Sequence, residues 1–300
     1  CPWSSDGRHI AFSSADPADL SAPHRDGLST DRGHVCLMDT TTFEIFVIAD
    51  DGFYTAHNGT FPIWHPKRNR LYYRCGVEQV ATFDVDAGQR ATWKGVLRQL
   101  SPDGTTFVSQ LNQVDRPDEP DAWGFHAMDA DGSNPRKLLS IKQLYDLTPN
   151  KDQFDIAEMT VGNPKWTPDS HHLLLTMWVH SKRHVRRSLY VADRDGSNLR
   201  WLTHFGHHHS WTPDGKAVLF NGYKSIRPDG NRKDPRMFLI DFDGTNRRVV
   251  FDHPVGSHPC MDPTGTMIAD CDGDGIWVVH IPEQRYERVA RFRQQFDTTH

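Results

Sequence analysis

The chain has 300 residues, of which 37% are hydrophobic and 24% charged, and its formal net charge at pH 7 is -5. A chain of this length can bury a large core, and no run approaches the roughly 18 consecutive apolar residues that a membrane-spanning helix requires. The acidic balance argues against general nucleic-acid binding. Five irregularly spaced cysteines give neither a disulfide framework nor a zinc-type Cys-x-x-Cys pair, so we expect structural thiols.

A turn motif recurs six times along the chain, and a short apolar run follows each copy at once. The turns are Ser5-Asp6-Gly7, His65-Pro66-Lys67, Ser101-Pro102-Asp103-Gly104, Thr167-Pro168-Asp169, Thr212-Pro213-Asp214-Gly215 and Asp262-Pro263-Thr264-Gly265. The apolar runs are 9–12, 70–73, 106–108, 172–175, 217–220 and 266–269, and third strands are expected at 35–39, 188–193 and 237–241. Pro-Asp-Gly and Asp-Gly between such runs are typical of β-hairpins, because glycine supplies the positive φ that these turns need. The pattern predicts an all-β fold, a β-propeller of four-stranded blades.

The repeat count sets the expected domain organisation. Six blades fit into this chain, and we expect a single propeller domain over residues 1–300. The sequence begins inside a first strand and stops where another first strand should start. We therefore expect a truncation at both ends and seven blades in the intact protein.

One histidine position recurs in the register of the repeat. His208 stands five residues before Pro213, and His258 stands five residues before Pro263. Equivalent offsets in a repeat occupy equivalent points in space, so two consecutive blades should aim imidazoles at one place. Such a convergence predicts a metal site or a proton-transfer site.

Two segments on the expected histidine face are basic although the protein is acidic. Long loops are expected at 13–33, 110–123, 178–187 and 222–236. Residues 180–187 carry Lys182, Arg183, Arg186 and Arg187 with no acidic residue, and residues 222–236 carry five basic residues, including Lys224 and Arg236, against two aspartates. A positive rim can focus an anionic ligand into a cleft. We predict a polyanion site, with Arg183, Lys224 and Arg236 binding substrate and Arg187 in the catalytic group.

Three Asp-x-Asp-Gly segments begin at Asp129, Asp193 and Asp241, and they resemble the first residues of a calcium-binding loop. Counted as twelve-residue loops they would end at Ser140, His204 and Asp252, none of which is the bidentate glutamate that such a loop needs. We interpret all three segments as turns.

The histidine segments resemble one enzyme family. Residues 208–215, His-His-Ser-Trp-Thr-Pro-Asp-Gly, resemble the His-x-x-Trp-x-Pro-Asp-Gly segment of the oligogalacturonate lyases, which are seven-bladed propeller enzymes of pectin breakdown. Residues 258–273 are similar to the metal-histidine segment of that family, and residues 294–300 to the start of its Gln-x-x-His-Pro-His segment. The resemblance implies that His208 is the base and that His258 and His300 bind manganese or another first-row divalent metal. Asp297 stands where the family has a glutamine ligand.

The activity that this resemblance implies is cleavage of an acidic oligosaccharide, oligogalacturonate or a related uronide, by metal-assisted β-elimination. The alternative is a non-catalytic propeller of the TolB type that serves as a protein-binding platform, since the turn repeat is widespread and a fold does not fix a function. A serine peptidase would need a Gly-x-Ser-x-Gly motif, which the sequence lacks. We expect neither a nucleic-acid nor a membrane partner, and a cytoplasmic location with the periplasm as the alternative.

Overall fold

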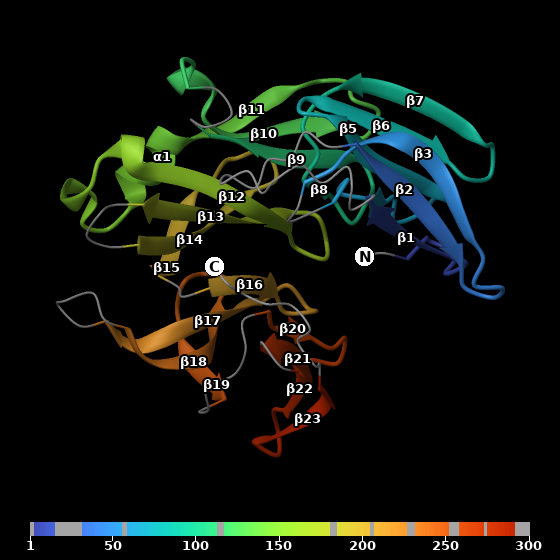
Figure 1. Ribbon diagram of the computed structural model, residues 1–300. Helices are drawn as coiled ribbons and strands as arrows, with labels where there is room; N and C mark the ends of the chain where they lie inside the picture. Colours follow the sequence, from blue (N-terminus) through green and yellow to red (C-terminus); the bar gives the residue numbers. More distant parts are fainter. Residues whose placement is uncertain are drawn as a thin grey trace. The chain divides into compact units, whose positions relative to one another are not determined.

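The computed structural model describes residues 3–15, 32–55, 59–112, 117–180, 185–204, 207–226, 232–251, 258–272 and 275–291. The chain is an all-β propeller of six antiparallel sheets, as the turn repeat predicts (Figure 1). Five sheets have four strands. The first sheet has three, and Trp3 adds an isolated bridge to Ile10 beside its first strand.

In every sheet the strands follow one another in chain order, so each blade is a meander. The first three sheets contain β1 (His9–Ser14), β2 (Arg32–Asp39), β3 (Ile45–Phe53); β4 (Ile63–Trp64), β5 (Arg70–Gly76), β6 (Gln79–Asp84), β7 (Gln89–Lys94); and β8 (Gln99–Leu100), β9 (Thr106–Leu111), β10 (Gly124–Asp129), β11 (Arg136–Ser140). The last three contain β12 (Met159–Trp166), β13 (His172–His180), β14 (Val185–Asp193), β15 (Arg200–His204); β16 (His207–Trp211), β17 (Ala217–Ile226), β18 (Arg232–Asp241), β19 (Arg248–Phe251); and β20 (Cys260–Met261), β21 (Met267–Asp272), β22 (Gly275–His280), β23 (Arg285–Arg291).

The chain folds into two compact units. One comprises Cys1–Leu111 and Phe125–Leu138, and the other comprises Asn112–Gly124 and Leu139–His300. The second unit carries the last three blades and both histidines that the repeat singles out. A single domain over residues 1–300 stays a prediction.

A buried hydroxyl closes the first hairpin of several blades. In the fifth blade the Thr212 N–H donates to the Ala217 carbonyl (2.9 Å), the Ala217 N–H donates back to Thr212 Oγ1 (3.0 Å), and Thr212 Oγ1 donates to Asp214 (2.7 Å). Ser101 and Thr167 make the same three kinds of contact in the third and fourth blades. The Thr-Pro-Asp or Ser-Pro-Asp motif therefore fixes the pairing register of the first two strands.

The core of the second unit lies between its first two sheets. Leu174 and Leu189 from one sheet pack with Val218, Phe220 and Phe238 from the next, and all five are at most 5% exposed. The apolar runs predicted at 172–175, 188–193, 217–220 and 237–241 are the buried strands of this core. Its close packing sets two innermost strands, β12 and β16, side by side.

The prediction of long loops at 178–187 and 222–236 is wrong for most of these residues. Strand pairing continues through Trp178↔Arg187 and His180↔Val185 in one blade, and through Gly222↔Arg236 and Ile226↔Arg232 in the next. β-Branched and aromatic residues continue the ladder, and long basic side chains can stand on paired strands while their charged ends reach water. Segments 13–33 and 110–123 are likewise partly strand, since β1 ends at Ser14 and β9 at Leu111.

A short helix, α1 (Ile141–Leu147), interrupts the β pattern and was not predicted. Three short 3-10 helices were likewise not predicted, at Pro120–Ala122, Lys151–Gln153 and Ile156–Glu158. The helix begins with a capping box in which Ser140 Oγ accepts from the Gln143 N–H while the Gln143 side chain accepts from the Ser140 N–H. Ile141 and Leu144 are its buried residues. Ser-x-x-Gln before an apolar run was the available signal. No helix in the described part of the chain is long and apolar enough to cross a membrane.

The second blade replaces the turn hydroxyl with a histidine, which leads to a prediction on pH. His65 is 6% exposed, its Nδ1 accepts from the Lys67 N–H (3.0 Å), and burial lowers its pKa below the usual 6.5. The unfolded chain therefore binds a proton more readily than the folded one, so stability is full above about pH 6.5 and is lost as pH falls toward the folded-state pKa. We expect the urea concentration at the midpoint of unfolding to decrease when the pH is lowered from about 7.5 to about 5.5.

The matched variant for this measurement is His65→Gln, which keeps an acceptor for the Lys67 N–H and cannot titrate. We expect its urea midpoint to depend less on pH over the same interval than that of the wild type. Equal slopes for the two proteins would show that His65 is not the titrating group.

Candidate functional site

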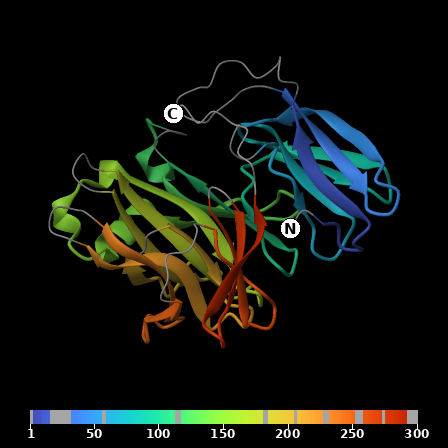
Figure 2. The same cartoon turned by 60° about the horizontal axis from the view of Figure 1, so that its bottom comes forward.

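The two histidines of the recurring position lie against each other. Their ring centroids are 3.8 Å apart, and the ring planes make an angle of 38°. His208 is half-buried on β16, while His258 is exposed just before β20. Figures 1 and 2 both place the sheet of β16–β19 beside the sheet of β20–β23, as the shared offset predicts.

A β-bulge presents His208. The pairing register of β16 shifts between His207 and His209, and His208 has a left-handed φ of 34°. The same offset in the preceding blade is occupied by Asn163, which has a φ of 45° beside the register shift of β12. A bulge re-aims a side chain and often lies next to a functional site, and a non-glycine residue held at positive φ carries local strain. The offset of five residues therefore marks a specialised backbone position.

A buried carboxylate holds the segment that carries His258. Asp270, which is 2% exposed on β21, accepts from the His258 N–H (2.7 Å) and from the Cys271 N–H (2.8 Å). Cys271 Sγ lies 3.6 Å from His258 Nδ1. These contacts orient the backbone at His258 before any ligand arrives.

His209 has a structural role. It is 2% exposed, its Nε2 lies 3.2 Å from Thr176 Oγ1, and the same nitrogen donates to the Asn163 carbonyl (3.3 Å). The Trp211 indole N–H also donates to the Lys165 carbonyl (3.1 Å). The innermost strands of the fourth and fifth blades are thereby joined directly under His208.

The two predicted arginine clamps are half-buried, and each stands in the half of its hairpin that is nearer the connecting loop. Arg236 pairs with Gly222, one residue from the Asn221↔His207 pair, so it lies two strands from His208 at the same end of the sheet. Two strand spacings correspond to about 10 Å. Arg187, opposite Trp178, occupies the matching end of the preceding sheet. Arg236 is therefore within reach of a ligand that contacts His208 and is larger than one sugar.

Several predicted site residues lie outside the described part of the chain, namely Arg183, Asp297 and His300. The backbone of Lys224 belongs to β17, and its side chain is likewise outside the description. Among the described residues no group of three His, Cys, Asp or Glu side chains could hold a metal ion. A metal centre at His258 therefore depends on the ligands predicted at Asp297 and His300.

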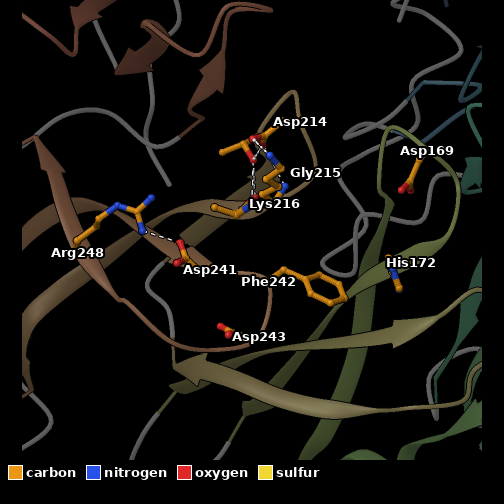
Figure 3. Close-up of a pocket in the computed structure, with 11 residues that line it drawn as sticks. Asp169, His172, Asp214, Gly215, Lys216, Asp241, Phe242, Asp243 and Arg248 are labelled. Carbon is orange, nitrogen blue, oxygen red and sulfur yellow. Dashed lines mark hydrogen bonds and ion pairs between the residues drawn. The ribbon is translucent and has the colours of Figure 1, made fainter.

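A cavity of about 730 Å³ opens beside the turns of the fourth and fifth blades (Figure 3). These turns lie at the ends of the sheets opposite to those that carry Arg187 and Arg236. Its lining includes Asp169, Asp214, Asp241 and Asp243, which belong to the Thr-Pro-Asp and Asp-x-Asp-Gly turns. Hydrogen bonds within the turns occupy Asp169, Asp214 and Asp243 and lower the pKa values of these carboxyl groups; the Thr245 hydroxyl and N–H on Asp243 are one example. The pKa of Asp241 is lowered first by the hydrogen bond from the Arg248 side chain and then by the one from Asn246. The segments beginning at Asp129, Asp193 and Asp241 are turns, as interpreted, since in each the glycine N–H donates to the carbonyl of the first aspartate (2.9 Å). We assign no ligand to this cavity, because its carboxylates are engaged in these turns and ion pairs.

Asp270, Cys271 and Lys165 were not predicted as site residues. The sequence did contain a signal for Lys165, because Lys165, Ser210 and Cys260 occupy one position of the repeat, three residues before the turn proline. Asp270 gives no comparable signal, since its role depends on a contact across twelve residues of chain.

The comparisons with known proteins establish the fold. No family model matches the chain, and no curated protein matches it. An oligogalacturonate lyase in complex with manganese aligns with a TM-score of 0.64 at 15% identity, over 96% of this chain and 75% of that one. The oligogalacturonate lyase of Vibrio parahaemolyticus gives 0.62 at 14% identity, over 96% and 76% of the two chains. The β-propeller domain of the Trilobed protease from Pyrococcus furiosus gives 0.57 at 11% identity, over 96% and 83%.

These structures define the class of this protein as a β-propeller. The structural neighbours include the oligogalacturonate lyases that the histidine segments resemble, at a sequence identity that bears on fold alone.

The contacts of Asp270 yield a prediction. Asp270→Ala should lower the free energy of unfolding by about 1–3 kcal/mol, because it leaves the His258 and Cys271 N–H groups without their acceptor. We expect the His258 ring resonances in a histidine-detected NMR spectrum to shift or broaden. Glu283→Ala, at an exposed carboxylate in the turn between β22 and β23 of the same blade, serves as the control and should leave those resonances in place.

Proposed function

We propose that this chain carries the site of a polysaccharide lyase that cleaves oligogalacturonate or a related uronide by β-elimination. The observation that supports it most is the contact between His208, on its strained bulge, and His258 of the next blade, with 3.8 Å between the ring centroids. The cationic side chains of Arg187 and Arg236 near the same ends of the sheets suit a polyanionic substrate.

The proposed reaction requires the protein to position the uronide and to remove one proton from it. His208 takes the C5 proton of the uronate, because an imidazole with a pKa near neutrality is a suitable base. The electron pair of the broken C–H bond forms the C4–C5 double bond while the bond from C4 to the glycosidic oxygen breaks. The departing oxygen acquires a proton, which balances the one lost from C5, and the product is a 4,5-unsaturated uronate.

A divalent first-row metal, when held by His258 with Asp297 and His300, would stabilise the enolate-like charge on the substrate carboxylate. The protein's own part at His258 is the orientation that Asp270 imposes on its backbone. Arginine binds carboxylates through two parallel hydrogen bonds, which is the role we assign to Arg187 and Arg236.

The test measures the ultraviolet absorbance of unsaturated uronates when the manganese-supplied protein is mixed with oligogalacturonates. His208→Ala should abolish the rise in absorbance and keep the metal content, because it removes proton transfer and no ligand. His258→Ala should lose both metal and activity. His171→Ala, an exposed turn histidine in the preceding blade, is the matched control and should behave as wild type.

Full activity in His208→Ala would refute its role as the base. Wild-type protein that gives no absorbance change with any uronide would favour the platform hypothesis instead.

Removing an arginine should weaken substrate binding more than turnover. We expect Arg187→Ala and Arg236→Ala to raise KM, with a loss that shrinks at high salt because screening already weakens the attraction in the wild type. Arg285→Ala is the control, since Arg285 is 51% exposed on the outermost strand β23 and pairs with Glu287 at 2.9 Å. An equal effect of all three substitutions would point to net charge instead of specific contacts.

A further inference from the structure

Lys165 is a half-buried cation near the histidine pair, and the proposed reaction does not use it. Its ammonium donates to the backbone carbonyl of His209, next to His208 in the chain. Within the described ranges, no carboxylate forms an ion pair with Lys165. Burial lowers the pKa of its ammonium, and the Cys260 thiol acts in the opposite direction. The side chain thus pays a desolvation cost that no described acidic residue offsets.

The repeat places Lys165 on the inner side of the second unit. Lys165, Ser210 and Cys260 each precede their turn proline by three residues, on the innermost strands β12, β16 and β20. The ammonium of Lys165 contacts the His209 carbonyl on β16, and the Lys165 carbonyl accepts from the Trp211 indole N–H (3.1 Å). The side chain of Lys165 therefore stands between the adjacent innermost strands β12 and β16. His208 on β16 in turn contacts His258, which lies just before β20.

The bulge in β12 favours a functional role. The register shift between Gly162 and Lys165 comes directly before the lysine, and bulges re-aim the side chains beside them. If Lys165 served only to join two strands, an apolar residue of the same length would stabilise the fold at least as well, because a lone buried charge is costly.

We propose that Lys165 is the anchor for a carboxylate group of the ligand, an acidic sugar bound at the inner ends of β12, β16 and β20. The ammonium can keep its hydrogen bond to the His209 carbonyl and offer its remaining two protons to a carboxylate. This inference deepens the proposed function, because it assigns one carboxylate of the uronide to a residue. A carboxylate anchor would serve a uronide-binding protein equally, so it does not require catalysis.

The experiment compares the binding of digalacturonate and of its neutral dimethyl ester by titration calorimetry, with a chelator present to prevent turnover. The wild type should prefer the acid over the ester. Lys165→Met should weaken acid binding by about tenfold or more, the effect of one charge-assisted contact, and leave ester binding unchanged. Lys216→Met removes a lysine whose side chain is 84% exposed and should change neither affinity.

A urea titration of the same variants separates the anchor from a structural tether. We expect Lys165→Met to retain or raise the wild-type midpoint, since it removes a desolvated charge. A lowered midpoint with unchanged acid binding would overturn the proposal, as would a wild type that binds both sugars equally or neither. Should Lys165→Met fail to fold, Lys165→Gln keeps a donor for the His209 carbonyl and makes the same comparison.

The outcome is distinguishable from that of the lyase test. Acid binding that depends on Lys165, without any unsaturated product, would refute the lyase and keep the anchor. If the protein forms the unsaturated product and Lys165→Met still prefers the acid over the ester, the lyase proposal stands and the anchor role of Lys165 is refuted.

Discussion

The hydrogen-bonded hydroxyl at the first hairpin of several blades is the constraint on which the rest of the inner surface depends. Thr212 exchanges backbone bonds with Ala217 and ties its hydroxyl to Asp214, and Thr167 and Ser101 repeat the arrangement. A shift of one residue in such a pair would turn every side chain of the strand to its other face. Because the register is fixed at the turn proline, residues counted back from it reach the same height in each blade.

The second determinant is a local departure from the regular strand. At the position of His208 the chain adopts a left-handed conformation and a bulge, and Asn163 does the same one blade earlier. The backbone strain recurs where the side chain differs, so it belongs to the repeat and not to histidine. The repeat supplies a pre-aimed position on β12 and β16, and this chain places the His208 imidazole on the second of them, in contact with His258 of the next blade.

The distribution of charge follows from these two features. At the turn ends the aspartates already have partners: hydrogen bonds within the turns lower the pKa values of Asp214 and Asp243, and the Arg248 side chain lowers that of Asp241. At the opposite ends Arg187 and Arg236 stand on extended hairpins, and Lys165 lies on the inner strands. An acidic protein thereby presents cations on the side that carries the histidines. Electrostatic focusing depends on this local arrangement more than on net charge.

The sequence by itself determined the blade repeat, its turns, the buried strands and the equivalence of His208 and His258, because hairpin chemistry is local and the repeat makes spatial equivalence countable. It did not determine the length of the hairpins around Arg187 and Arg236, since basic residues on paired strands look like loop residues when their partners are unknown. Ser140-x-x-Gln143 marked the start of helix α1 and was missed against the strong β pattern. Only the tertiary structure decided that Asp270 holds His258 and that Lys165 reaches the His209 carbonyl. Those contacts join residues far apart in the chain, and packing between strands and blades sets their geometry.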